Sequence, residues 1–140
     1  MTGKLLGVDY GDVRTGLAVS DPAGLLATGV GTIRPGGMRN TARAVAEEAR
    51  ARACTGIVVG LPKNMDGSEG FRAEAVRAFA ALLGEETPLP IAFFDERLST
   101  VEAHRYLTET GTHGKRRRES VDTLSAQIIL QDYLDCERRK

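Results

Sequence analysis

Three acidic residues stand where folding of the chain could bring them together. Asp9 ends the apolar segment 4–8, and Glu96 follows the apolar segment 91–94. Asp122 lies in the first turn of a helix expected near the C-terminus. Carboxylates are rarely buried without a partner, so acids at the ends of two apolar segments are unusual. Their types and positions suggest one acidic site built from two strand ends and a helix.

Such a cluster would repel itself unless a cation lay among the carboxylates. Mg²⁺ prefers oxygen ligands and is commonly held by a few carboxylates together with substrate phosphates. Two such ions about 3.5–4 Å apart can clamp the attacking and leaving oxygens of an in-line displacement. We therefore expect Mg²⁺ or Mn²⁺ as cofactor and hydrolysis of a nucleic-acid phosphodiester as the reaction.

Each acid also has a simpler explanation. Asp9 could accept hydrogen bonds from the turn that follows it, and Asp122 could merely favour a helix N-terminus electrostatically. Asp95 competes with Glu96, because adjacent strand residues point to opposite faces and only one is expected to face Asp9. Glu119 is a further candidate beside Asp122, although its basic surroundings favour a solvated position.

Basic and polar residues near the acids are candidates for holding substrate. Two arginines could each grip a phosphate or pair with a neighbouring acid, and a loop asparagine could contact a substrate strand. The strongest basic run directly precedes the helix that carries Asp122, which favours contact with the phosphate backbone. The scarcity of aromatic residues argues against extensive base stacking. The expected substrate contacts are Arg14, Asn64, Arg97, Lys115, Arg116, Arg117 and Arg118.

Three strands are expected to open the fold. Residues 4–10 and 14–20 are apolar segments joined by a short turn at Gly11, which predicts an antiparallel hairpin. Residues 25–33 supply a weaker third strand.

The pattern then changes to alternating helices and strands. Residues 38–53 have apolar residues at helical spacing, and 57–59 form a β-branched run typical of a strand buried on both faces. Residues 60–67 are rich in turn formers. Ser68 is expected to cap a second helix that ends at Gly84. The predicted inner faces of the two helices are Ala42, Val45, Ala46, Ala49 and Ala53, and Phe71, Ala75, Phe79 and Leu82.

A last strand and two helices complete the chain. Residues 91–94 form the strand, and Ser99 with Glu102 predicts a capping box for a helix that stops by residue 111. Residues 111–118 are expected to be a basic connector, followed by a helix from about 120 to 136. The order βββαβαβαα predicts an α/β fold with one mixed sheet covered by helices on both faces.

Four segments together resemble one known family. Residues 7–21, 60–70, 95–100 and 120–134 resemble, in order, motifs of the YqgF family, bacterial proteins described as pre-16S rRNA nucleases and Holliday-junction-resolvase-like proteins. The resemblance implies a single RNase H-like domain over 1–140, with a five-stranded sheet in the order 3-2-1-4-5 and strand 2 antiparallel.

The resemblance also extends to the site. It implies that Asp9, Glu96 and Asp122 are the catalytic and metal-binding acids, and it favours Glu96 over Asp95. It further implies a role in trimming the 5′ end of the 16S rRNA precursor, with precursor particles of the ribosome as partners.

Composition indicates the class of protein and its expected location in the cell. The 41% hydrophobic and 27% charged residues are those of a soluble globular protein. Nineteen basic and nineteen acidic residues cancel, which weighs against bulk electrostatic capture of nucleic acid. Cys54 and Cys136 match no metal spacing and are expected to be reduced thiols. No apolar run approaches the ~20 residues that span a bilayer, so a cytoplasmic location without a membrane partner is expected.

Other functions stay open at this level. A resolvase of branched DNA would need a homodimer, because its substrate has two-fold symmetry, whereas an RNA-processing nuclease could be a monomer. A binding factor that keeps the fold without catalysis would explain the neutral charge. The segment Asp9 to Gly11, followed by Gly16, also resembles a phosphate loop of the actin and sugar-kinase superfamily, although those proteins enclose nucleotide between two such domains.

Overall fold

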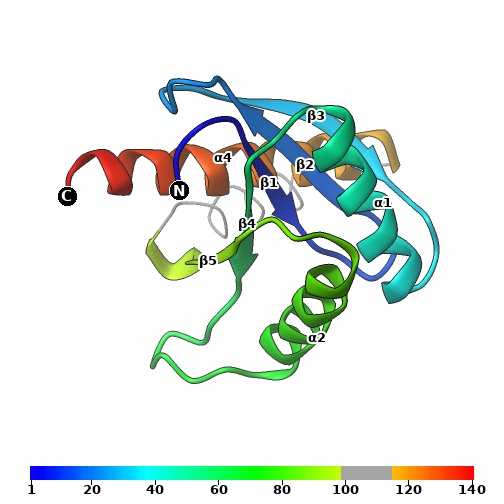
Figure 1. The fold of residues 1–140 in the computed structure, drawn as a ribbon. Helices are drawn as coiled ribbons and strands as arrows, with labels where there is room; N and C mark the ends of the chain where they lie inside the picture. Colours follow the sequence, from blue (N-terminus) through cyan, green and yellow to red (C-terminus); the bar gives the residue numbers. More distant parts are fainter. Residues whose placement is uncertain (99–114) are drawn as a thin grey trace.

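A computed structural model describes residues 1–98 and 115–140, with side chains from residue 123 onward in the second range (Figure 1). Within these ranges the strands and helices follow one another in the predicted order. The elements are β1 (Leu5–Asp9), β2 (Thr15–Ser20), β3 (Ala27–Ile33), α1 (Met38–Ala51), β4 (Gly56–Leu61), α2 (Phe71–Glu86), β5 (Ile91–Asp95), the 3₁₀ turn η1 (Glu96–Leu98) and α4 (Lys115–Arg138).

The five strands form one mixed sheet in the order β3-β2-β1-β4-β5. Strand β2 is antiparallel to both β1 and β3, whereas β4 runs parallel to β1 and β5 runs parallel to β4. The carboxyl ends of β1, β4 and β5 therefore lie at the same edge of the sheet. This arrangement confirms the predicted strand order and the antiparallel second strand.

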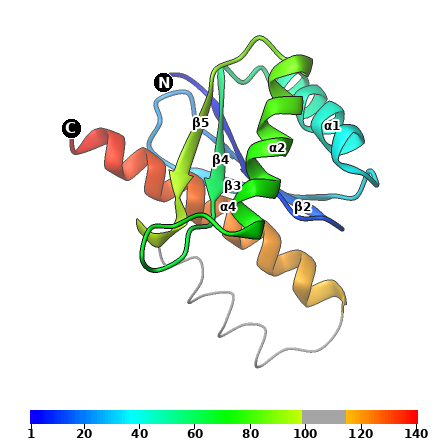
Figure 2. The same ribbon diagram turned by 90° about the horizontal axis from the view of Figure 1, so that it is seen from below.

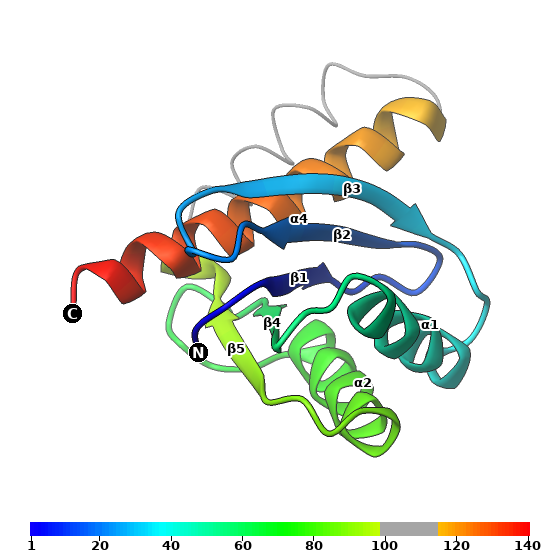
Figure 3. The ribbon, with the colours of Figure 1, turned by 45° about the horizontal axis from the view of Figure 1, so that its top comes forward.

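Helices cover both faces of the sheet. Figure 2 shows α1 and α2 on one side and α4 on the other, and Figure 3 shows α4 crossing β3 and β2. Each face has its own apolar core. The core under α1 and α2 includes Leu6, Val8, Val45, Val59 and Phe79, and the core under α4 includes Leu5, Val58, Phe94, Ile129 and Leu130. The prediction of helices on both faces is confirmed.

Alternation along β1 fixes the direction of its last residue. Leu6 and Val8 belong to the core under α1 and α2, whereas Leu5 belongs to the core under α4. A Cβ added to Gly7 would lie 2.7 Å from Cβ of Leu130, so Gly7 also faces α4. Because side chains alternate along a strand, Asp9 lies on the α4 face.

Helix α4 runs antiparallel to β3. The Gln131 side-chain oxygen accepts from the Ala27 N–H at 2.9 Å, and the Gln127 side-chain oxygen accepts from the Gly29 N–H at 3.2 Å. Two residues forward along β3 thus correspond to four residues backward along α4. Since β3 and β1 run in the same direction, the N-terminal part of α4 lies toward the carboxyl end of β1.

The predicted start of the second helix was wrong. Helix α2 begins at Phe71 after Gly70, and no side chain caps it. The Ser68 hydroxyl instead donates to Asp66 Oδ1 at 2.6 Å and accepts from Asn64 Nδ2 at 3.0 Å. The serine therefore stabilises the turn before the helix, and the helix starts later than its sequence pattern indicates.

The later start also changes which residues face the core. Phe71, predicted to be internal, is 80% exposed, while Phe79 is buried as predicted. The predicted end at Gly84 was also wrong, because the helix continues to Glu86. A Cβ built at Gly84 would have no neighbour within 4 Å, so this glycine faces open space. The buried residues of α2 are Ala73, Val76, Phe79, Ala80 and Leu83.

Two other helix boundaries differ from prediction. Helix α1 ends at Ala51, and Ala53 lies beyond it with a positive φ of 57°. Residues 115–118 belong to α4 rather than to a connector, because lysine and arginine are good helix formers despite the neighbouring glycines. The helix expected over 99–111 lies outside the described residues. Within the described part, no helix is long and apolar enough to span a membrane.

Candidate active site

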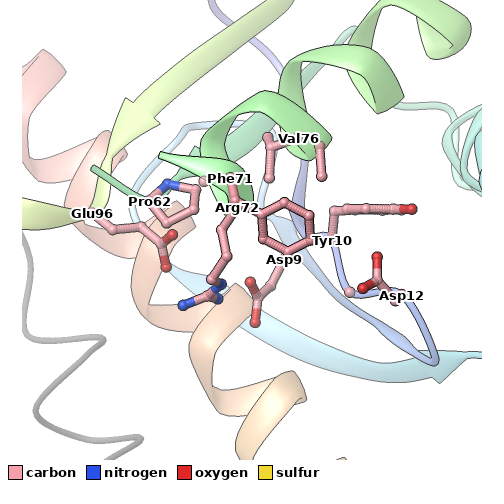
Figure 4. A pocket seen from close by; sticks show the side chains of 11 residues that line it. Asp9, Tyr10, Asp12, Pro62, Phe71, Arg72, Val76 and Glu96 are labelled. Atoms are coloured by element: carbon pink, nitrogen blue, oxygen red, sulfur yellow. The ribbon is translucent and has the colours of Figure 1, made fainter. Parts of the chain in front are cut away.

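A pocket opens at the edge of the sheet where β1, β4 and β5 end. Asp9 and Glu96 both line it, together with the first turns of α2 (Figure 4). The pocket is small and open to solvent, with a cavity volume of about 90 Å³. Its lining residues are Asp9, Tyr10, Gly11, Asp12, Gly60, Pro62, Phe71, Arg72, Ala75, Val76 and Glu96.

The two acids reach the pocket from different strands. Asp9 is the last residue of β1 and is 5% exposed, and Glu96 directly follows β5 and is 3% exposed. Phe94 packs in the core under α4, so the alternation along β5 directs Glu96 toward the same face as Asp9. Burial of two carboxylates in one pocket is costly unless charge or hydrogen bonds compensate it, which marks this pair as the centre of the site.

Gly60 separates the two acids on the intervening strand. Val59 is the partner of Val8 in the ladder of β1 and β4, and Gly60 is the partner of Phe94 in the next ladder. A Cβ at Gly60 would lie 3.5 Å from Cδ of Glu96 and 2.5 Å from Cδ1 of Ile129. Because glycine has no side chain at this position of β4, the Glu96 carboxylate has room beside the strand.

Asp95 points away from the pocket and binds Arg97. The carboxylate accepts from Nη2 of Arg97 at 2.7 Å, from Nε at 3.1 Å and from the Arg97 backbone N–H at 2.9 Å. This pairing holds the pKa of Asp95 below its ordinary value. The structure therefore brings Glu96, and not Asp95, together with Asp9, which is the choice that the family resemblance favoured.

Three of the predicted substrate residues lie close in sequence to residues of the pocket. Asn64 donates to the Ser68 hydroxyl and organises the loop between β4 and α2. Arg97 lies in the ion pair with Asp95, and Arg14 is half-buried just before β2. None of the three lines the pocket. Their contact with substrate remains a prediction.

The third predicted acid lies on α4. Asp122 and the basic residues from Lys115 to Arg118 occupy the N-terminal turns of this helix, where the structure describes the backbone alone. Glu119 lies in the same turns. Among the residues whose side chains are described, no group of three or more His, Cys, Asp or Glu side chains forms a metal site. The structure thus joins two of the three predicted acids and leaves the third a prediction.

Sequence reasoning missed two residues of the pocket. Arg72, in the first turn of α2, extends its guanidinium toward the space between the Asp9 and Glu96 carboxylates, and Phe71 stands beside it (Figure 4). The sequence did hold a signal for Arg72. A cation in the first turn of a helix opposes the helix dipole, so its presence there calls for another reason.

The chemistry of the pocket suits a divalent cation. Carboxylate oxygens are the ligands that Mg²⁺ and Mn²⁺ prefer, and Asp9 and Glu96 offer them from rigid strand ends. The strand ends also fix the two carboxylates before substrate arrives, which favours catalysis by preorganised charge. The donor set therefore fits the metal that the sequence predicted.

Fold and site together define a class, the RNase H-like hydrolases that cleave phosphodiester bonds. The solved structure of T. thermophilus RuvC in complex with a Holliday junction substrate shares the fold, with a TM-score of 0.59 over 98% of this chain and 96% of that chain at 13% identity. The model of the family described as "RuvX: Holliday junction resolvase" matches residues 3–136, and the chain belongs to this family.

Curated relatives support the same assignment. A Cereibacter sphaeroides protein named "Putative pre-16S rRNA nuclease" is 48% identical over 134 residues, covering 96% of this chain and 84% of the relative. A Moorella thermoacetica protein of the same name is 47% identical over 132 residues, covering 94% of each chain. The family resemblance, the fold and the prediction of a nuclease are confirmed.

Proposed function

We propose that the chain is a metal-dependent nuclease that processes the precursor of 16S rRNA, with Asp9, Glu96 and Asp122 as its catalytic and metal-binding acids. The observation that carries the proposal is the burial of Asp9 and Glu96 in one pocket, at the edge of the sheet where β1, β4 and β5 end. The names of the relatives support the RNA substrate. The proposed setting is ribosome biogenesis in the cytoplasm.

The course of α4 supports Asp122 as the third acid. Gly7 faces Ala126 and Leu130, and Asp9 lies two residues further along β1, about 6.6 Å or about four residues of helix. Because α4 runs antiparallel to β1, the same step along the helix leads back to positions 122–126. Position 122 also precedes the buried Ala126 by four residues, and residues four apart lie on the same side of a helix, which supports the proposal.

In the proposed mechanism, the acids act from fixed positions. Bound Mg²⁺ or Mn²⁺ would supply an activated water and would stabilise charge on the phosphate as the bond breaks. Asp9 and Glu96 would hold the metal at the carboxyl ends of β1 and β5. Burial of both carboxylates restricts the surrounding water and strengthens their electrostatic effect on the reacting phosphate.

Binding of the nucleic-acid backbone is proposed for the basic turns of α4. Lys115, Arg116, Arg117 and Arg118 lie one to two helical turns before Asp122, so a strand that reaches the acids would pass near them. Such contacts lower the affinity as salt rises, because each neutralised phosphate releases counterions. Precursor particles of the ribosome would be the physiological partner.

Cleavage of branched DNA is the second candidate, and the description of the family favours it. The two candidates differ in symmetry. A junction resolvase needs two active sites related by a two-fold axis, whereas processing of an RNA end needs one. Solution mass, measured together with cleavage of matched RNA and junction substrates, separates them: a monomer that cuts only RNA supports the proposal, and a dimer that cuts only junctions replaces it.

Amide substitutions at the acids test the catalytic assignment. We expect Asp9→Asn, Glu96→Gln and Asp122→Asn each to lower the cleavage rate of a precursor 16S rRNA fragment about a hundredfold or more in Mg²⁺ or Mn²⁺, because each removes a charged ligand. The matched control is Asp135→Asn, near the other end of α4, where the acid pairs with Arg138. This variant should cleave like the wild type.

Two results would contradict the proposal. Equal residual activity in the wild type and in Asp9→Asn would show that the acid pocket does not carry the reaction. Tight binding of the RNA that survives EDTA and the triple amide variant, without cleavage by the wild type, would favour the non-catalytic binding factor.

A further inference from the structure

The first turn of α2 presents two side chains that the fold itself does not use. Phe71 is 80% exposed, the largest exposed fraction of any aromatic residue in the described part of the chain, and it lines the same pocket as Asp9 and Glu96. Arg72 follows it and is also exposed. Neither belongs to an apolar core, and both lie at the mouth of the acid pocket (Figure 4).

The surroundings of Arg72 differ from those of its neighbours. Arg39, Arg43 and Arg77 each form an ion pair with a glutamate, but within the described part of the chain Arg72 joins none. Its helix position opposes the dipole of α2, which costs stability. Its guanidinium instead reaches toward the two pocket carboxylates. An arginine kept in this place is suited to an anion that must approach the acids, and guanidinium binds phosphate oxygens well.

Arg77 connects the start of α2, which carries both residues, to the sheet. Glu69, just before α2, accepts two hydrogen bonds from Arg77, at 2.5 and 2.6 Å. The Arg77 guanidinium also lies 5.0 Å from the centre of the Phe93 ring on β5. These contacts connect the start of α2 to its second turn and to β5, the strand that leads to Glu96.

We propose that Phe71 and Arg72 form the subsite for one unpaired nucleotide of the substrate: Arg72 binds the phosphate that is cut, and Phe71 stacks on the base beside it. The inference rests on the proposed nuclease function. A base inside a duplex is already stacked on both sides, so a ring standing at the pocket rim can stack only on a base that has left the helix. The subsite therefore selects a single-stranded segment at the cleavage position.

Binding measured in EDTA tests the subsite without cleavage. The probe is a fluorescein-labelled single-stranded RNA of about 12 nucleotides, compared with the same strand annealed to its complement. We expect Phe71→Ala to weaken binding of the single strand about 5- to 100-fold, as for loss of one stacked base, and to leave the duplex unaffected. Replacement of one base by an abasic nucleotide at the stacked position should remove the effect of Phe71→Ala.

Arg72 is tested through the dependence of affinity on salt. Loss of one phosphate contact should reduce the slope of log K against log salt for the single strand by about 0.7, so Arg72→Ala should show this smaller slope and Arg72→Lys should largely retain the wild-type value. In cleavage assays, Arg72→Ala should lower kcat more than it raises KM, because the contact is to the reacting phosphate.

Matched controls lie at the opposite end of the sheet. Leu26→Ala removes an apolar side chain that is 63% exposed, and Arg50→Ala removes an arginine from the last turn of α1, and both should bind like the wild type. Equal weakening of single strand and duplex by Phe71→Ala, or none, would overturn the stacking role. An unchanged salt slope in Arg72→Ala would overturn the phosphate role. Failure of the nuclease assignment itself would show separately, as equal cleavage by the wild type and Asp9→Asn.

Discussion

At the scale of single residues, the pairing of Asp95 with Arg97 decides where Glu96 points. These two neighbours of Glu96 bind each other through three side-chain hydrogen bonds and one from the Arg97 backbone N–H, which close the chain into a tight turn. Glu96 then projects on the other side, into the pocket with Asp9. The acid that looks like a competitor in the sequence is therefore part of what positions the glutamate.

The pH dependence of stability tests this pairing. Arg97 lowers the pKa of Asp95 in the folded state, so the pair stabilises the fold above the unfolded-state pKa, and this stability is lost as pH falls through the lowered folded-state pKa. The two side chains are partly exposed, so we expect Asp95→Asn to lower the unfolding free energy by about 0.5–1 kcal/mol at pH 7.

Urea unfolding of wild type and variant at pH 7 and at acidic pH measures the effect. The difference between the two proteins should shrink below about pH 4, once Asp95 begins to protonate in the unfolded chain. An equal difference at pH 7 and well below pH 3 would mean that the ion pair does not stabilise the turn. Cleavage at pH 7 should also fall in the variant, because Glu96 loses its fixed position.

At the scale of elements, glycines let α4 pack directly on the sheet. Cβ atoms added to Gly7, Gly29 and Gly60 would lie 2.5 to 2.7 Å from side-chain atoms of α4. The Cβ added to Gly7 would also lie 3.2 Å from the Ala126 carbonyl oxygen. This oxygen belongs to the helix backbone, which cannot move aside as the end of a flexible side chain can. The close approach sets the distance between Asp9 and the helix that carries Asp122.

Alanine substitutions at two glycines separate this steric role from the general effect of glycine. Gly7→Ala should lower the unfolding free energy by about 1–3 kcal/mol, because α4 must move away from β1. Gly84→Ala, in open space within α2, should raise it by about 0.5–1 kcal/mol, because alanine favours the helix. Thermal and urea unfolding measure both, and equal destabilisation by the two would contradict the packing argument.

The element order was predictable because short apolar runs mark the strands, helical spacing of apolar residues marks the helices, and turn formers separate them. The exact phase of α2 was not, since the turn around Ser68 resembles a helix cap while its hydrogen bonds go to Asp66 and Asn64. Because of that error, Phe71 was predicted to lie in the core, and neither Phe71 nor Arg72 was predicted to line the pocket. Asp9 and Glu96 were predictable because acids at the ends of apolar strands stand out, whereas the choice against Asp95 depended on the family resemblance and on a local pairing that sequence alone does not reveal.

At the scale of the whole molecule, the distribution of charge matters more for binding of nucleic acid than the total charge. Nineteen basic and nineteen acidic residues cancel, so binding of a polyanion depends on where the cations lie. Arg72 lines the pocket with Asp9 and Glu96, and the N-terminal turns of α4 contain the basic residues of the proposed backbone contact. Metal bound by the acids would add positive charge, and metal and nucleic acid are thereby expected to favour each other's binding.

Global stability should report metal binding independently of cleavage. A ligand at about ten times its Kd stabilises the folded state by about 1.4 kcal/mol, which for a domain of this size corresponds to about 3–6 °C in Tm. We expect Mn²⁺ to raise the Tm of the wild type by this amount, and of Asp135→Asn equally. The Tm of Asp9→Asn and Glu96→Gln should stay unchanged at the same concentration, because each has lost a carboxylate ligand. An equal rise in all four proteins would locate the metal elsewhere, whatever their cleavage activities.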